Sequence, residues 1–188
     1  MEMVLSILIG LGLSAACGFR VFVPLLVMSL ASRSEVGHLV LGDGFAWIGS
    51  DAALIAFGAA TLLEIAGYYI PWVDNLLDAV ATPTAIIAGI LVSASAFTDV
   101  SPFLKWTLAI LAGGGTTAMF QGFTATARQI SSFTTGGLGN PVVATIEAGG
   151  SALLAVLAIT LPVLAFVVVV SLLFFAARRL LFRRTASA

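Results

Sequence analysis

Residues 4–31 read VLSILIGLGLSAACGFRVFVPLLVMSLA and contain a single charged side chain, Arg20. About 20 predominantly apolar residues are enough for a helix to cross the hydrocarbon core of a bilayer. The acidic residue Glu2 precedes the run where a signal peptide would have a basic segment, and the run continues well past Cys17. We therefore predict a retained transmembrane helix in this part of the chain.

Four more apolar stretches follow, at about residues 52–70, 79–97, 104–125 and 151–177. The chain is 60% hydrophobic and 9% charged, with a mean hydropathy of +1.14, whereas soluble domains carry about 25% charged residues. Such a composition leaves too much apolar surface for water and favours lipid as the solvent. We predict an all-α, polytopic transmembrane helical bundle of about five spans, with re-entrant or broken segments, forming one domain over residues 1–188.

Basic residues predict the orientation, because lysine and arginine are enriched in cytoplasmic loops. In a five-span bundle Arg33, Lys105 and the tail arginines share one side, and only Arg128 lies on the other. The tail arginines are Arg178, Arg179, Arg183 and Arg184. We expect a multi-pass protein of the inner cell membrane with its N-terminus outside and residues 177–188 as a basic cytoplasmic tail.

Several functional classes are excluded by composition. One cysteine and one histidine cannot form a His/Cys metal site or a disulfide framework, so we predict no metal and no cofactor. A net charge of −1 provides no basic surface for nucleic acid. No arrangement of nucleophile and base is recognisable, and we predict that the protein is not an enzyme.

Arg20 is the most informative residue of the first apolar run. An arginine at the centre of a membrane helix costs about 2.5–3.5 kcal/mol, so it needs a partner or water. Pro24 lies four residues later, where its ring clashes with the carbonyl of residue 20 and offers it no N–H. We expect a kinked helix, with Arg20 either in a structural ion pair or in a pore or binding site.

Three acidic residues further along the chain raise the same question. Glu64 lies well inside the second predicted span, where carboxylates usually face a cavity or a partner. Asp74 and Asp78, in the stretch PWVDNLLD at residues 71–78, would share one face of a helix. Their repulsion would be relieved by a cation, a proton or an arginine, unless the stretch is a solvated loop.

A second group of polar residues follows the fourth predicted span. Arg128 ends that span, Asn140 precedes a proline that suits a helix start, and Glu147 follows. A half-helix at 141–148 would then dip into the membrane, where irregular backbone must be buried in protein or line water. Each half of the chain would then have an arginine followed by a glutamate, Arg20 with Glu64 and Arg128 with Glu147, a pattern that suggests an inverted repeat.

Small residues recur every four positions in two of the predicted spans, which lets helix backbones approach closely. The two stripes are Gly10, Ser14, Gly18 and Gly114, Ala118, Gly122. If these stripes face each other, the first and fourth spans touch, and Arg20 lies near Gln121 or Arg128.

Three stretches resemble a known family: GFRVFVPLL at 18–26, PWVDNLLDAVATPTAIIAG at 71–89 and TARQISSFTTGGLGNPVVATIEAGG at 126–150. Together they are similar to the small bacterial membrane proteins catalogued as domain of unknown function 4126. The resemblance implies that seven residues lie in characteristic segments of the family, namely Arg20, Asp74, Asp78, Arg128, Asn140, Pro141 and Glu147. It implies no activity.

Two functions remain open. The first is a transporter or channel for a small solute or ion, with a site built from the residues Arg20, Glu64, Asp74, Asp78, Arg128, Asn140 and Glu147. In this hypothesis an arginine holds an acid or an anionic solute, a glutamate carries a proton or cation, and a homo-oligomer would suit so small a protomer. The alternative is a structural or assembly protein that binds membrane proteins or lipids, with the charges as interhelical locks and the tail against anionic headgroups.

Overall fold

The computed structural model describes residues 2–34 and 39–185, with the side chains of residues 71–72, 74–75, 78–79, 177 and 179–185 outside this description. The described residues form helices and no strand, so the all-α prediction is confirmed. The elements are α1 (Glu2–Cys17), α2 (Phe22–Ala31), a 3-10 turn (Ala46–Gly49), α3 (Asp51–Gly67), α4 (Pro71–Ala96), α5 (Pro102–Leu108), a π-helical segment (Ala109–Gly114), α6 (Gly115–Thr135), α7 (Asn140–Thr160) and α8 (Pro162–Thr185).

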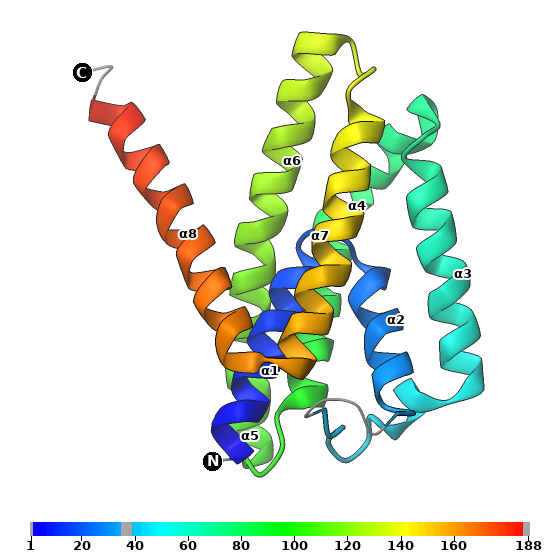
Figure 1. Ribbon diagram of the computed structural model, residues 1–188, viewed down its shortest axis with the longest axis vertical. Coiled ribbons are helices and arrows are strands. Elements are labelled where there is room, and N and C mark those ends of the chain that lie inside the picture. Colours follow the sequence, from blue (N-terminus) through cyan, green and yellow to red (C-terminus); the bar gives the residue numbers. More distant parts are fainter. Residues whose placement is uncertain (1, 35–38, 186–188) are drawn as a thin grey trace.

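The first apolar run forms a helical hairpin. Helix α1 rises from the end that carries the N-terminus, residues 18–21 reverse the chain in the middle of the molecule, and α2 returns to the same end (Figure 1). The predicted single span over 4–31 is therefore wrong. Pro24 lies in the first turn of α2, where a helix tolerates proline because the missing N–H would have no intrahelical partner, so the helix restarts at this point and does not merely kink.

The remaining helices run the length of the molecule in alternating directions (Figure 1). Helices α3, α4, α5–α6, α7 and α8 follow one another up and down, and α8 leads to a C-terminus at the opposite end from the N-terminus. Arg33 follows α2 and Lys105 lies in α5, at the N-terminal end. The predicted location of the tail arginines on the same side as these two residues is wrong.

The tail arginines lie at the opposite end because a helix break, which was not predicted, separates α7 from α8. Leu161, between α7 and α8, has φ −134° and ψ 66°. It precedes Pro162, and proline disfavours the helical conformation of the residue before it. The predicted span at 151–177 therefore becomes parts of two helices. The predicted half-helix at 141–148 is the beginning of the 21-residue α7.

Two other boundaries differ from the prediction. Helix α4 begins at Pro71 and includes the PWVDNLLD stretch, so Pro83 lies inside the helix instead of in its first turn. Helix α6 continues to Thr135 and ends at Gly136, whose φ of 63° is left-handed, as is common after a helix C-terminus. Helix α3 begins directly after Ser50, whose hydroxyl accepts a hydrogen bond from Ala53 N at 3.1 Å.

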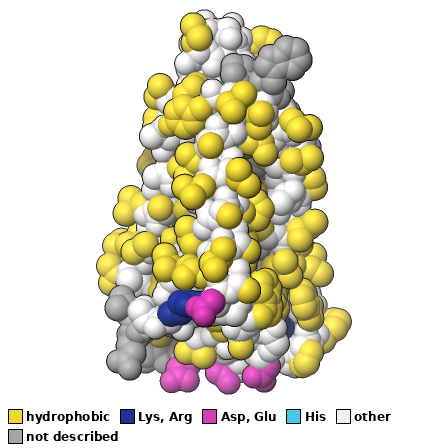
Figure 2. Space-filling view, turned by 90° about the vertical axis from the view of Figure 1, so that its right-hand side faces the viewer, with side chains coloured by type: hydrophobic (Ala, Val, Ile, Leu, Met, Phe, Trp, Pro, Cys, Tyr) yellow, Lys and Arg dark blue, Asp and Glu magenta, His cyan; other side chains and the backbone are white. Residues whose placement is uncertain are grey.

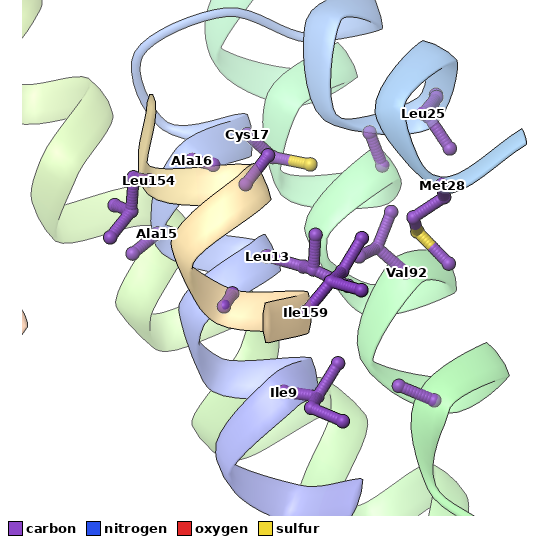
Figure 3. Close-up of a cluster of buried hydrophobic side chains, with 14 of the residues drawn as sticks. Ile9, Leu13, Ala15, Ala16, Cys17, Leu25, Met28, Val92, Leu154 and Ile159 are labelled. Atoms are coloured by element: carbon purple, nitrogen blue, oxygen red, sulfur yellow. The ribbon is translucent and has the colours of Figure 1, made fainter. Parts of the chain in front are cut away.

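Helix α1 lies at the centre of the packing and contacts α2, α4, α6, α7 and α8. In the core, Leu13, Met28, Val92 and Ile159 of four different helices point toward one another (Figure 3). Buried hydroxyl groups donate hydrogen bonds to main-chain oxygens of α1 from three neighbouring helices. These bonds are Ser93 Oγ to Gly10 O (3.1 Å), Thr117 Oγ1 to Ser14 O (2.7 Å) and Ser151 Oγ to Ala16 O (2.9 Å).

The first and fourth predicted spans contact each other, but the face of α6 that contacts α1 is not the predicted stripe of small residues. Gly18 approaches Phe120 and the main chain of Thr117. Gly122 has no described atom within 4 Å of its Cβ position, and Gly114 faces α4 at Ile86 and Ile90. The predicted stripe of α6 therefore does not meet the stripe of α1.

Hydrophobic side chains cover most of the height of the face seen in Figure 2, and charged side chains gather near its lower end. Among the helices described, Asn140–Thr160 alone has the length and apolar composition to cross a membrane. Four shorter apolar helices accompany it, at Glu2–Cys17, Phe22–Ala31, Val80–Ala96 and Pro162–Ala176. The core helix of a soluble protein can also have these properties.

The close approach of α1 to its neighbours gives a test of the packing. A Cβ atom on buried Gly12 would lie 2.6 Å from Cβ of Ala158. We expect Gly12→Ala to lower the free energy of unfolding by about 1–3 kcal/mol, as overpacking does. Gly122→Ala is the matched control and should leave it unchanged or raise it by up to about 1 kcal/mol through helix propensity. Thermal unfolding of the purified variants measures both, and equal stability of the two would contradict this packing.

Candidate functional site

Five buried side chains meet where the α1–α2 hairpin reverses, and we call them the charge centre. They are Arg20 in the turn, Glu64 on α3, Tyr68 directly after α3, Arg128 on α6 and Glu147 on α7. Each is nearly inaccessible to solvent: 2% of Arg20 and of Arg128 is exposed, 3% of Tyr68, 4% of Glu147 and 8% of Glu64. The structure thus brings together four of the predicted site residues.

Glu147 binds both arginines. Its Oε2 lies 3.0 Å from Nη2 of Arg20, and its Oε1 lies 3.3 Å from Nε of Arg128. Nη2 of Arg20 also donates a hydrogen bond to the carbonyl oxygen of Ala144 at 3.0 Å, nearly one turn earlier on α7. Helix α7 therefore holds the hairpin turn and α6 through one carboxylate.

Tyr68 supplies a second contact to both cations. The guanidinium carbon of Arg20 lies 3.9 Å from the ring centroid, and that of Arg128 lies 4.4 Å from it. The negative face of an aromatic ring attracts cations, by about 2 kcal/mol or more where water is excluded. The ring thus helps two like charges to lie close together.

Glu64 binds backbone. Its Oε1 accepts a hydrogen bond from Val21 N at 2.9 Å, and its Oε2 accepts one from Phe22 N at 3.1 Å. A carboxylate at a helix N-terminus satisfies donors that have no intrahelical partner and interacts favourably with the helix dipole. Glu64 therefore stabilises the start of α2, whereas Glu147 pairs with Arg20.

Of the other three predicted residues, the structure describes the side chain of Asn140 alone. Asn140 is 6% exposed at the start of α7, and its amide donates a hydrogen bond to Ser132 Oγ of α6 at 3.0 Å. Asp74 and Asp78 lie among the first residues of α4, and their side chains are outside the described part of the structure. Asn140 therefore links α6 to α7 beside the charge centre.

The sequence analysis did not identify Tyr68. No motif marks it, and its only signal is that Tyr68 and Tyr69 are the two tyrosines of the chain. Tyr69 contacts α7, with its hydroxyl 2.7 Å from Oγ1 of Thr145. Tyr68 thus connects the end of α3 to the two arginines, and Tyr69 connects it to the helix that carries Glu147.

A cavity of about 730 Å³ lies away from the charge centre. It is lined by the first half of α1, the loop at 39–43 and residues near the start of α5. Within the ranges 2–34 and 39–185, no cluster of three His, Cys, Asp or Glu side chains could hold a metal ion.

Comparisons with known proteins identify one family. The model described as Domain of unknown function (DUF4126) matches residues 7–181. No curated protein and no solved structure matches the chain. The match covers every residue of the charge centre and agrees with the resemblance seen in the sequence.

Removing the shared carboxylate tests the geometry of the centre. Glu147→Gln leaves two buried guanidinium groups without their common anion, and loss of one partner of a buried ion pair costs about 3–5 kcal/mol. The matched control is Asp51→Asn, because Asp51 pairs with Arg33 at 2.7 Å but its side chain is 89% exposed. That variant should cost about 0–1 kcal/mol. Chemical denaturation compares the two, and equal costs would show that Glu147 does not bridge the arginines.

Proposed function

The chain belongs to the DUF4126 family, and we propose that it is a bacterial inner-membrane protein that carries a small solute or ion across the bilayer as a transporter or channel. The observation that supports this most directly is the position of Arg20. Its side chain is 2% exposed and lies at the turn of a hairpin that ends in the middle of the molecule (Figure 1).

Composition and surface support a membrane location. Only 9% of the residues are charged, and large apolar side chains such as Leu62, Leu63, Leu153 and Phe174 are exposed on α3, α7 and α8. Apolar surface of this extent is unfavourable in water and favourable in lipid. In this proposal α3, α4, α5–α6, α7 and α8 cross the membrane, and the α1–α2 hairpin enters from one side.

Charge at the two ends supports the proposed orientation. The N-terminal end carries Glu2, Asp51 and Asp99 beside Arg33 and Lys105. The opposite end carries the four tail arginines, and basic residues favour the cytoplasmic side. The proposal therefore keeps the N-terminus outside and the C-terminus in the cytoplasm. The five helices that cross the membrane differ from the five predicted spans.

Reporter fusions to the C-terminus test this orientation. A fluorescent protein should fold and emit light there, and alkaline phosphatase should be inactive, because the first matures in the cytoplasm and the second in the periplasm. The reverse pattern would contradict the orientation. Extraction of the protein from membranes by high salt alone would contradict the membrane location.

The hairpin and the charge centre together support transport. Where chains enter a membrane as half-helices, their ends are buried in protein or line a water-filled path, and such ends often form solute sites in transporters. Glu147 is held by the side chains of Arg20 and Arg128. Glu147 can therefore release the arginines and bind a proton. The arginines can then bind a solute in place of Glu147.

One observation favours the second candidate, a structural or assembly protein. The four described ionic groups of the centre comprise two cations and two anions, all at most 8% exposed, as an interhelical lock would require. Binding of lipids or other membrane proteins would then occur elsewhere, and the charges would act on stability alone. Measurement of flux separates the two candidates.

Solute entry into proteoliposomes tests transport. Osmotic light scattering follows the entry of urea, glycine, sodium chloride, potassium nitrate and sodium formate. We expect entry of at least one solute to exceed that in protein-free liposomes, to be lost in Glu147→Gln and to persist in Asp51→Asn. Entry equal to that in protein-free liposomes for every solute, with folded protein present, would contradict transport and support the interhelical lock.

A further inference from the structure

Arg20 has hydrogen-bond donors that the described protein does not use. Its Nη2 binds Ala144 O and Glu147 Oε2, each at 3.0 Å. Its Nε and Nη1 are buried, and neither has a hydrogen-bond partner among the residues that the structure describes. A buried donor without an acceptor is unfavourable, and more so when it is charged. Native proteins leave few such groups, so these donors suit an acceptor beyond the described residues.

The way in which Glu147 is held indicates the chemistry of that acceptor. One planar carboxylate reaches both guanidinium groups, with an oxygen 3.0 Å from Nη2 of Arg20 and the other 3.3 Å from Nε of Arg128. Guanidinium groups match the planar geometry of carboxylates. The carboxylate of a solute would present the same pair of oxygens to the same two cations.

A cation suits the centre less well. Both guanidinium groups lie within 4.4 Å of the centroid of the Tyr68 ring, so a cation bound there would face two positive charges. Of the two described carboxylates, Glu64 is already bound to Val21 N and Phe22 N. Only Glu147 would remain for a cation within the described set.

We propose that Arg20 and Arg128 bind a small planar oxyanion of the carboxylate class, such as formate, acetate or bicarbonate, and that Glu147 is the internal carboxylate that competes with it for the two guanidinium groups. This inference rests on the proposed function and names the class of its cargo. The anion must be small because Arg20, Tyr68, Arg128 and Glu147 are each at most 4% exposed.

Competition by Glu147 makes the inference quantitative. A solute binds only the fraction of molecules in which Glu147 has left the arginines, and the apparent affinity is reduced by that fraction. Minor conformations of proteins are commonly populated at about 0.1–10%. Removal of the charge in Glu147→Gln should therefore tighten binding about tenfold or more.

Equilibrium dialysis of radiolabelled formate against the purified full-length chain in detergent tests the site. We expect wild-type protein to bind formate saturably, with competition by acetate and not by chloride. Glu147→Gln should bind about tenfold more tightly, and Arg20→Lys should bind more weakly because it lacks the planar fork. Asp51→Asn, which alters an exposed ion pair at the opposite end of α3 from Tyr68, should bind as the wild type does.

A second variant and a second readout keep the outcome decisive. If Glu147→Gln does not fold, Glu147→Asp shortens the internal carboxylate by one methylene group and should also tighten formate binding. Absence of saturable formate binding in wild type and in the folded Glu147 variant would overturn the site, as would equal competition by chloride. Formate binding without solute entry in proteoliposomes would contradict transport alone, whereas solute entry without formate binding would overturn the site alone.

Discussion

Glu147 holds two buried guanidinium groups at once, and the central part of the fold depends on that one carboxylate. Its oxygens lie 3.0 Å from Arg20 and 3.3 Å from Arg128, so α7 is joined to the α1–α2 turn and to α6. Tyr68 adds the end of α3 to the same point. A buried charge without a partner is strongly destabilising, so these elements have to come together around Glu147. In addition, the α1–α2 turn can form only if its backbone donors have acceptors. Glu64 meets that second condition by binding Val21 N and Phe22 N.

The position of α1 at the centre of the bundle has its own physical requirement. Neighbouring helices must approach its backbone closely, and Gly12 and Gly18 leave the space in which Ala158 and Phe120 pack. Hydroxyl groups from α4, α6 and α7 then bind main-chain oxygens of α1. In lipid, no hydrophobic driving force brings helices together. Helices associate there through close backbone contact and interhelical hydrogen bonds. The packing of α1 therefore suits the proposed lipid environment as well as it suits a compact core.

Part of this arrangement could be predicted from sequence, and the missing part has identifiable causes. The energetic cost of a buried charge singled out Arg20, Glu64, Arg128 and Glu147, and all four lie in the charge centre. Which acid binds which arginine could not be predicted, because the pairing of Arg20 with Glu147 spans 127 residues and depends on where the first apolar run reverses. An apolar run has the same composition whether it crosses a bundle or turns back halfway. Tyr68 was missed since its role comes from position alone, and the break at Leu161 was missed because the apolar pattern continues through Pro162.

The structure also separates the two glutamates, which the sequence treats alike. Glu64 is bound to two amide groups at the start of α2, and these groups cannot leave it unless the first turn of that helix unfolds. Glu147 is bound to side chains, whose rotamers can change while every helix keeps its backbone hydrogen bonds. Changes of rotamer are fast and local, whereas opening of a buried helix end belongs to the slower motions of local unfolding. A site that must bind and release its occupant repeatedly is therefore better served by Glu147, and the role of Glu64 is to hold the turn from which Arg20 reaches it.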